Sequence, residues 1–438
     1  MLRLASPIVL AELGWSGMAV VDTMMVGRLP ASADAMGAVS LGSILFYSVG
    51  IFGTGLMLGL DTLVSHSYGA GKMEDCHRSL VNGVYLSFAA APVLMGAVWL
   101  LGRVLPHVGI GTVLLNLALP YMHALNWSMF PLLLYFVFRR YLQGIDQPAP
   151  VMFALLSANL VNLLGNWVFI FGHFGAPAMG PTGSGVATSI SRLYMAGMLL
   201  GFIFYHDHRN KLGLRSASVH PNFDRISRLA RLGLPAASQW TVEVSVFAIA
   251  TSLIGKLGAV PLASHQIAIN LASLTYMVPL GIGAAAAVRV GQALGRKDPE
   301  GAKHSGWTGI ALGGAFMCCM AIVFWTVPRP IVRLFTPASD VIAMAAKLLF
   351  VAAYFQIFDG LQTVATGALR GTGDTHTALF CHLLAYWLVG LPLGYYLCFS
   401  RGMGATGIWA GLSVALIFIG IALIYFWSRK VRVLMAGT

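Results

Sequence analysis

Twelve apolar runs of about 20 residues follow one another along the chain, and this pattern limits the possible folds more than any other feature. A helix of that length crosses roughly 30 Å of hydrocarbon. Glycine and proline occur freely inside membrane helices, so the ends of the runs are less well defined than their number. The sequence therefore predicts an all-α membrane protein with twelve transmembrane helices. The runs lie near residues 5–27, 37–64, 79–102, 112–138, 149–172, 183–205, 228–254, 263–288, 305–327, 342–369, 376–399 and 404–427.

The charged residues fit a bilayer environment. Of the 438 residues, 58% are hydrophobic and only 10% are charged, against about 25% charged residues in soluble domains. If the N-terminus is cytoplasmic, the connections on that side hold 19 Lys and Arg residues and the outer connections hold six. This count assigns Arg139, Arg140 and Arg370 to cytoplasmic loops and leaves only Arg192 and Lys347 within or near helices. The positive-inside rule then predicts that both termini are cytoplasmic.

The net charge of +12 is explained by these loops facing anionic lipid. Basic residues do not alternate with aromatic residues in the way that would indicate binding to nucleic acid, so no nucleic-acid partner is expected. The first apolar run lacks a small-residue cleavage site, and we expect no removable secretion signal.

The chain repeats itself with an offset of 228 residues. The segment RLASP at 3–7 matches RLGLP at 231–235, and GRL at 27–29 matches GKL at 255–257. The two halves, with six helices each, therefore run in the same direction across the membrane. We expect an N-lobe over residues 1–205, a basic cytoplasmic linker over 206–227 and a C-lobe over 228–438.

Parallel repeats are a standard construction of secondary transporters, in which substrate and ion sites lie near the membrane midplane. An ATP-driven pump would need a phosphate-binding loop such as GxxxxGK followed by Ser or Thr, and the sequence contains none. We therefore expect an ion gradient to supply the energy, and we expect no cofactor.

Acidic residues inside the apolar runs are the main functional candidates. A charge at the centre of a membrane helix costs roughly 3 kcal/mol on insertion scales, so such residues usually serve a pathway or an ion. Asp22, Glu243 and Asp359 lie well inside their runs, and we interpret them as functional. For Glu12 a functional and a structural role are equally plausible from the sequence. Asp61 is expected near a helix end, where it would reach water and basic partners.

Amide side chains form a second candidate group in the fifth run. Asn162 and Asn166 are four residues apart and therefore share one face of a helix. Such amides can simply bond neighbouring helices, which is worth about 1 kcal/mol. Beside Asp22 they resemble neutral oxygen ligands that complete a carboxylate site for a hard cation.

Several motifs together resemble the multidrug and toxic compound extrusion (MATE) transporters, in particular their bacterial NorM-like branch. The resemblance covers nearly the whole chain. It implies two six-helix bundles arranged as a V, located in the bacterial inner membrane, and efflux of organic cations in exchange for Na⁺ or H⁺. The motifs are VVDTMMVGRL, NLLGNWVFIFGHFGAP, GVATSI, GLPAASQWTVEVSVFAIA and FQIFDGLQTVATGALRGTGDT.

The family's essential residues can be carried over to this chain one by one. Its acids correspond to Asp22, Glu243 and Asp359, and its N-lobe amides correspond to Asn162 and Asn166.

The same resemblance places Thr188 close to the N-lobe site. Glu12 and Gln266 are secondary candidates. NorM-like chains often carry Tyr one turn before the tenth-helix acid, where this chain has Phe355, so an aromatic hydroxyl is missing there.

The resulting hypothesis is a monomeric transporter, not an enzyme, that exports cationic amphiphilic small molecules. Na⁺ is expected either at Glu243 and Asp359 or at Asp22, Asn162 and Asn166, with H⁺ as the alternative coupling ion. A flippase for lipid-linked oligosaccharides is one alternative, but it should carry Arg or Lys inside its cavity for an anionic pyrophosphate. A membrane-embedded enzyme is the alternative from another class, and clustered histidines or acids with metal-ligand spacing would indicate it.

Overall fold

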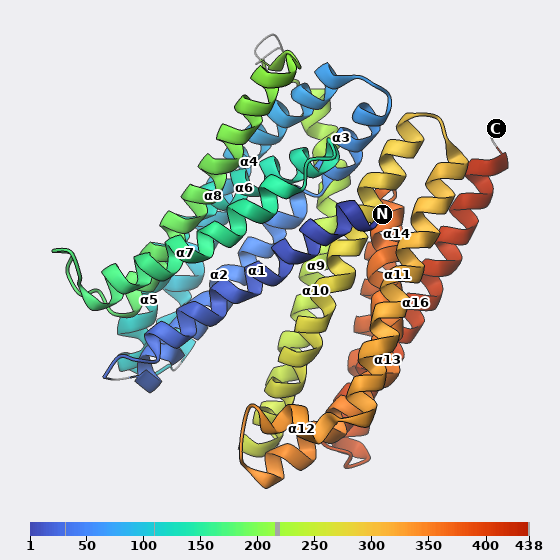
Figure 1. Ribbon diagram of the computed structural model, residues 1–438. Helices are drawn as coiled ribbons and strands as arrows, with labels where there is room; N and C mark the ends of the chain where they lie inside the picture. Colours follow the sequence, from blue (N-terminus) through green and yellow to red (C-terminus); the bar gives the residue numbers. More distant parts are fainter. Residues whose placement is uncertain (31, 109, 215–219, 437–438) are drawn as a thin grey trace. The chain divides into compact units, whose positions relative to one another are not determined.

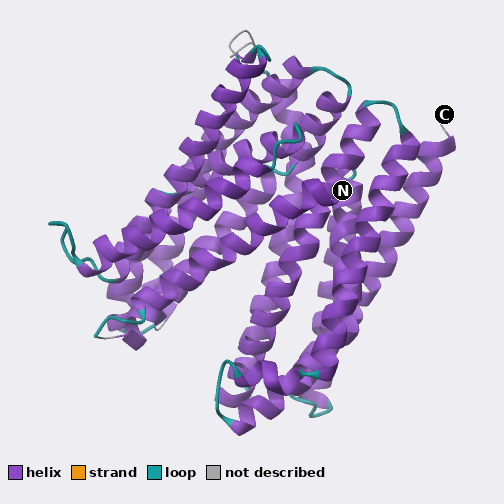
Figure 2. Ribbon diagram, viewed as in Figure 1, coloured by secondary structure: helices purple, strands orange, loops and turns teal. Residues whose placement is uncertain are grey.

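The computed structural model describes residues 1–30, 32–108, 110–214 and 220–436, and every regular element in these ranges is a helix (Figure 2). The first half contains α1 (Leu2–Val26), α2 (Ser32–Leu56), α3 (Gly59–Gly69), α4 (Met73–Val104), η1 (Leu105–Val108), α5 (Thr112–Asn126), α6 (Met129–Gly144), α7 (Ala149–Phe171) and α8 (Pro181–Asn210). The second half contains α9 (Phe223–Gly255), α10 (Ala259–Gly295), α11 (Pro299–Thr326), α12 (Pro328–Arg333), α13 (Ser339–Gly371), α14 (His376–Leu383), η3 (Leu384–Gly390), α15 (Leu391–Tyr395), η4 (Tyr396–Ser400) and α16 (Ala405–Ala436).

Eleven helical segments within the described ranges are long and apolar enough to cross a membrane. The expected span over 112–138 is not among them, and it is interrupted at Trp127 and Ser128, between α5 and α6. Pro131 explains the interruption, since proline lacks the N–H that would bond the carbonyl of residue 127. α6 then continues to Gly144, past the end of the predicted run. The run over 37–64 is also interrupted, at Met57 and Leu58 between α2 and α3.

The chain divides into two compact units. One unit, here called the N-unit, is Leu10–Ala237, and the other, the C-unit, is Met1–Val9 together with Ser238–Thr438. Both divisions fall inside helices, within α1 and within α9. α8 extends to Asn210 and α9 begins at Phe223, so helix reaches into both ends of the predicted linker. Residues 215–219 of that linker lie outside the described residues.

In the N-unit, α7 and α8 form an antiparallel pair, and α5 packs against both α2 and α8 (Figure 1). A Cβ atom at Gly183 would lie 2.4 Å from the backbone oxygen of Phe169. Only glycine therefore permits α7 and α8 to approach each other this closely. The close approach brings the polar faces of the two helices together.

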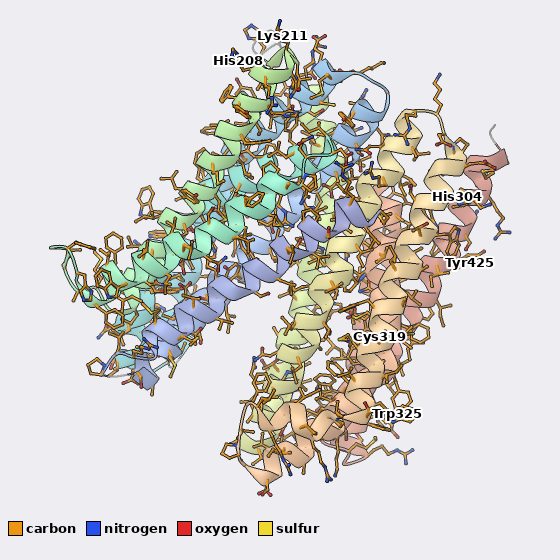
Figure 3. The ribbon with its side chains drawn as sticks, viewed as in Figure 1. His208, Lys211, His304, Cys319, Trp325 and Tyr425 are labelled. Carbon is orange, nitrogen blue, oxygen red and sulfur yellow. The ribbon has the colours of Figure 1, made fainter. Side chains whose placement is uncertain are left out.

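In the C-unit, α13 lies at the centre and packs against α10, α11 and α16 (Figure 1). A Cβ atom at Gly367 would lie 2.1 Å from the backbone oxygen of Gly283, so α10 and α13 also meet backbone to backbone. The outer surfaces of α11 and α16 carry exposed side chains such as Trp325 and Tyr425, which point away from the bundle (Figure 3). Exposed apolar residues of this kind suit a lipid environment.

Candidate functional site

The first candidate site lies in the N-unit, where α1, α7 and α8 place four polar side chains together. Nδ2 of Asn166 donates to Oδ1 of Asp22 at 2.7 Å and to Oδ1 of Asn162 at 3.2 Å. The Thr188 hydroxyl donates to Oδ2 of Asp22 at 3.0 Å. Nδ2 of Asn162 donates to Oγ1 of Thr188 at 3.5 Å. The four side chains therefore form a closed ring of hydrogen bonds, and all four are buried.

This ring supplies Asp22 with neutral donors only. Within the described residues, Asp22 takes part in no ion pair. Oδ1 of Asn166 is also buried without a hydrogen-bond partner. Carboxylate, amide and hydroxyl oxygens are the ligands that hard cations prefer. The geometry thus offers a carboxylate and an unpaired amide oxygen to a small cation that would replace part of the ring.

The second candidate site lies in the C-unit and joins α9, α13 and α14. Nε2 of Gln239 lies 3.4 Å from Oε2 of Glu243 and 3.3 Å from Nε2 of His382. That histidine nitrogen lies 3.0 Å from Oε1 of Gln362, and Nε2 of Gln362 donates to Oδ1 of Asp359 at 3.1 Å. A continuous polar chain therefore connects the two predicted acids. In the part of the chain that the structure describes, neither acid forms an ion pair.

Two buried acids of the N-unit have arginine partners instead. Glu12 forms a buried ion pair with Arg139, and Asp61 lies 3.5 Å from Nη1 of Arg140. The prediction that Asp61 reaches water is wrong, because its side chain is fully buried, and its arginine partner comes from α6. The assignment of both arginines to a loop is also wrong: they are 1% and 2% exposed, because α6 continues beyond the apolar run.

Two other buried arginines, Arg192 and Arg370, have distinct surroundings. Arg192 donates to the Tyr47 hydroxyl at 2.8 Å and lies over the Phe46 ring, 4.9 Å from its centroid. Arg370, predicted in a loop, is buried instead. It lines a small cavity in the C-unit together with Gln239 and Gln362. Among the described residues four arginines are therefore buried, whereas the sequence placed only Arg192 within a helix.

Two secondary candidates lie apart from the polar chain of the C-unit. Phe355 is buried one turn before Asp359, and its ring centroid is 6.0 Å from that of Trp409. Gln266 is exposed, and its amide donates to Asn270 on the same helix at 3.4 Å.

Three residues of the C-unit site were missed by the sequence reasoning. Gln239 lies four residues before Glu243, and Gln362 lies three residues after Asp359, so helical spacing could have identified both. His382 lies on a different helix from either acid, and spacing along the sequence contains no signal for it.

A family model described as MatE matches the chain twice, over residues 7–168 and 235–396. The chain belongs to the MatE family. The second match begins and ends 228 residues after the first, which confirms the internal repeat at the predicted offset.

Curated relatives in several bacteria match the MATE chain over nearly its full length. It is 37% identical to the probable multidrug resistance protein NorM of Mesorhizobium japonicum, over 99% of this chain and 94% of that protein. It is 34% identical to the multidrug resistance protein MdtK of Yersinia enterocolitica, over 98% of this chain and 95% of that protein. The predicted relationship to NorM-like MATE proteins is confirmed.

Solved structures share the fold. The crystal structure of the eukaryotic MATE transporter AtDTX14 matches with a TM-score of 0.88 at 22% identity, covering 99% of this chain and 97% of that one. A MOP superfamily transporter from Pyrococcus furiosus matches with a TM-score of 0.86 at 17% identity, covering 99% and 96%, and a binding pocket of reverse polarity has been described for it. The predicted MATE fold is confirmed, and the chain is a multi-pass membrane transporter.

Proposed function

We propose that this MATE protein is a secondary active multidrug efflux transporter. It exports cationic amphiphilic small molecules by alternating access, in exchange for Na⁺ entering the cell. Its NorM and MdtK relatives carry the name multidrug resistance protein. The protein acts as a monomer and as a transporter, not as an enzyme.

The observation that carries this proposal is the contrast between paired and unpaired acids. Glu12 and Asp61 have arginine partners, whereas Asp22, Glu243 and Asp359 form no ion pair within the described ranges. Asp22 and Asp359 are buried, and Glu243 is half-buried. A carboxylate shielded from water without a positive partner is strongly disfavoured, so it gains most from binding a cation. A proton, Na⁺ or a cationic drug can each supply that charge. Competition between them for the same carboxylates is what antiport requires.

Na⁺ is the favoured coupling ion because of the number of oxygen ligands in the N-unit. Asp22, Asn162, Asn166 and Thr188 together present carboxylate, amide and hydroxyl oxygens in one buried cluster. A proton would need only one carboxylate, whereas Na⁺ needs several hard oxygen ligands. The surplus of oxygens at Asp22 therefore favours Na⁺ over H⁺ there.

The membrane potential limits the stoichiometry. Moving one elementary charge inward gains about 2.3 kcal/mol per 100 mV. Exchange of one Na⁺ for one monovalent drug cation cancels this gain, because equal charges move in opposite directions. Export is then driven by the chemical gradient of Na⁺ alone, or more than one ion enters for each drug molecule.

The orientation follows from the distribution of Lys and Arg. Three of the 19 residues counted on the cytoplasmic side are buried arginines of α6 and α13. Without them sixteen remain, against six on the outer side. The positive-inside rule still favours cytoplasmic termini, in the inner membrane of a bacterium.

One observation favours a second candidate, the flippase for lipid-linked oligosaccharides. Arg370 lines the polar cavity of the C-unit, and an arginine in that position suits an anionic pyrophosphate. The sequence argument against a flippase assumed that such an arginine was missing, and that premise is wrong. The unpaired acids nevertheless favour a cationic cargo.

The test uses purified protein in proteoliposomes, with ethidium as the cargo. Na⁺ and H⁺ gradients are imposed separately, at clamped membrane potential. We expect ethidium to move against its gradient when Na⁺ is supplied on the opposite side at constant pH. Efflux that ignores Na⁺ and follows a pH step would reassign the coupling ion to H⁺.

A parallel set of vesicles separates the two candidate functions. It contains a fluorescent pyrophosphate-linked lipid and no ethidium. Movement of this lipid between leaflets, without ethidium transport, would replace efflux by flippase activity.

A further inference from the structure

Arg192 places a permanent positive charge inside the N-unit, and the hydrogen bonds and ring contacts that hold it are to neutral groups. Its guanidinium donates to the hydroxyls of Ser128 and Tyr47. It also lies over the rings of Phe46 and Trp15, 4.9 Å and 6.0 Å from their centroids. Among the described residues no carboxylate forms an ion pair with it. The charge is therefore buried without a direct negative partner.

This arginine differs in that respect from Arg139 and Arg140 of the same unit, which lie beside Glu12 and Asp61. A guanidinium stays protonated in proteins, so Arg192 cannot become neutral to escape the cost of burial. An ionisable group at membrane depth is costly and usually has a function. The question is which nearby group its charge acts on.

The nearest part of the candidate ion site is Thr188. Arg192 lies four residues after Thr188 on α8, so the two side chains share a face of the helix, one turn apart. The Thr188 hydroxyl donates to Oδ2 of Asp22. Arg192 also interacts electrostatically with Asp22, although the two form no ion pair. The positive charge therefore lies close to the ring of hydrogen bonds around Asp22 without being a member of it.

A cation that enters this ring is repelled by Arg192. The repulsion is proportional to the product of the two charges, so a divalent cation is repelled twice as strongly as a monovalent one. The ligands alone do not make this distinction, because carboxylate, amide and hydroxyl oxygens suit Ca²⁺ as well as Na⁺. The two ions also have nearly the same radius, so the size of the ring does not separate them.

The net charge of the site leads to the same expectation. An ionised Asp22 and Arg192 together carry no net charge. Binding of Na⁺ leaves one positive charge in the buried region, whereas binding of Ca²⁺ leaves two. Buried charge without compensation is expensive, so the divalent ion is the less favoured of the two.

We propose that Arg192 makes the cation site at Asp22 selective for monovalent over divalent cations. It acts by its charge and does not touch the ion, so it determines specificity without being a ligand. The inference rests on the proposed function, because it concerns the Na⁺ site of the N-unit. It adds the reason why a site with ligands suited to Ca²⁺ would reject that ion.

The test measures binding by isothermal titration calorimetry of the purified full-length protein in nanodiscs of zwitterionic lipid. NaCl or CaCl₂ is the titrant, at constant pH and ionic strength and without drug. Only the binding that Asp22→Asn abolishes is counted, which separates it from binding at the acids of the C-unit. Protons that compete for Asp22 weaken both ions by the same factor. They therefore cancel in the ratio of the two dissociation constants, which is the quantity compared.

Arg192→Met removes the charge and keeps an unbranched side chain. A unit charge roughly 10 Å away, at an effective dielectric constant of about 20, changes a binding constant on the order of 10-fold for each charge on the ion. Arg192→Met should therefore strengthen Ca²⁺ binding on the order of 10-fold more than it strengthens Na⁺ binding.

Three further variants separate charge from packing. Arg192→Lys keeps the charge and should keep the wild-type ratio. Arg103→Met is the matched control, because Arg103 is exposed on α4 and lies over the Trp99 ring, 4.0 Å from its centroid. It should leave the ratio unchanged. If Arg192→Met does not fold, Arg192→Gln removes the charge, keeps an N–H donor for Ser128 or Tyr47, and should shift the ratio in the same direction.

An unchanged ratio in the neutral variants would overturn the inference, because a loss of packing alone weakens both ions alike. A shift in Arg192→Lys as large as that in Arg192→Met would also overturn it, since the shape of the side chain would then be responsible. Absence of Asp22-dependent binding in the wild-type protein would have the same consequence. The measurement involves no transport. Failure of ethidium efflux would therefore refute the proposed function without deciding this result, and the reverse also holds.

Discussion

The two units hold their unpaired acids in different surroundings. In the N-unit, Asp22 is one member of a closed ring with Asn162, Asn166 and Thr188, which are neutral and not titratable at physiological pH. In the C-unit, Glu243 and Asp359 are joined through two amides and the imidazole of His382. The N-unit site thus surrounds one acid with neutral oxygens, whereas the C-unit site places an imidazole and two amides between two acids.

The two halves of an internal repeat therefore need not have the same residues at their candidate ion sites. The family model matches both halves at one fixed offset, yet Asp22, Glu243 and Asp359 have no acidic counterparts in the other half. The sequence pattern that forms the helical bundle is therefore repeated in both halves, whereas the acids of the candidate ion sites are not. Each site can then be altered separately, and the following experiments do so.

The largest effect is expected from removing the charge of either acid in the C-unit. Glu243→Gln and Asp359→Asn should each reduce ethidium efflux to the level of empty liposomes, because the cation site loses its charge. Membrane insertion and monodispersity in gel filtration should be retained, since neither acid has an ion-pair partner among the described residues that would be left behind.

The matched control for these variants is Glu74→Gln. Glu74 is exposed on α4 and pairs with Arg78 one turn away on the same helix, an interaction worth little. It should transport at the wild-type rate. Normal efflux in either C-unit variant would remove that acid from the mechanism.

The next largest effect concerns stability and the paired acids of the N-unit. Arg139→Met leaves Glu12 buried without its partner, and removal of one member of a buried pair costs about 3–5 kcal/mol. We expect a lower midpoint of thermal unfolding in detergent, followed by tryptophan fluorescence. Glu12→Gln in the same chain should recover most of the loss.

A comparison with Asp22→Asn sharpens this prediction. The hydrogen-bond partners of Asp22 are neutral, so its neutralisation should leave the thermal midpoint close to that of wild type. A loss as large as that of Arg139→Met would mean that Asp22 also has a structural role.

Sequence reasoning identified most of the N-unit site and only part of the C-unit site. Asp22, Asn162 and Asn166 could be found because a charge in lipid is costly and because residues four apart share a helix face. Thr188 needed the family resemblance as well. The structure brings all four into one ring.

Contacts between helices set the limit of such reasoning. Arg139 was taken for a loop residue because the apolar run ends just before it, and its partner Glu12 lies 127 residues earlier in the chain. His382 lies 143 residues after Gln239, and no periodicity connects them. Periodicity in a single sequence predicts which residues share a face of one helix. It does not predict which helices lie next to each other or how far apart their side chains are.

A smaller effect is expected at the N-unit ring. Asn166→Ala removes the donor to Asp22 and the unpaired amide oxygen together. A hydrogen bond or ligand to a charged group is worth about 1.5–3 kcal/mol, so the Na⁺ concentration for half-maximal efflux should rise roughly 10-fold or more. Asn159→Ala is the control, because Asn159 lies on the same helix but donates to backbone oxygens of Gly14 and Leu155. An unchanged Na⁺ dependence in Asn166→Ala would show that the amides have only a structural role.

The smallest effect is expected from Phe355→Tyr, which places a hydroxyl one helical turn before Asp359. Phe355 is buried against Trp409, so the new hydroxyl would be poorly solvated and would seek a partner near the acid. A neutral oxygen beside a carboxylate improves a site for Na⁺ more than a site for a proton, because only the metal ion needs further ligands. One added interaction of about 1 kcal/mol corresponds to a roughly fivefold lower Na⁺ concentration for half-maximal efflux, measured at constant pH. Phe355→Leu, which cannot supply an oxygen, controls for the change in packing. The tyrosine variant could have the Na⁺ dependence of wild type while the Asn166 variant does not. In that case Na⁺ acts only in the N-unit. The two units would then differ as a metal site and a proton site.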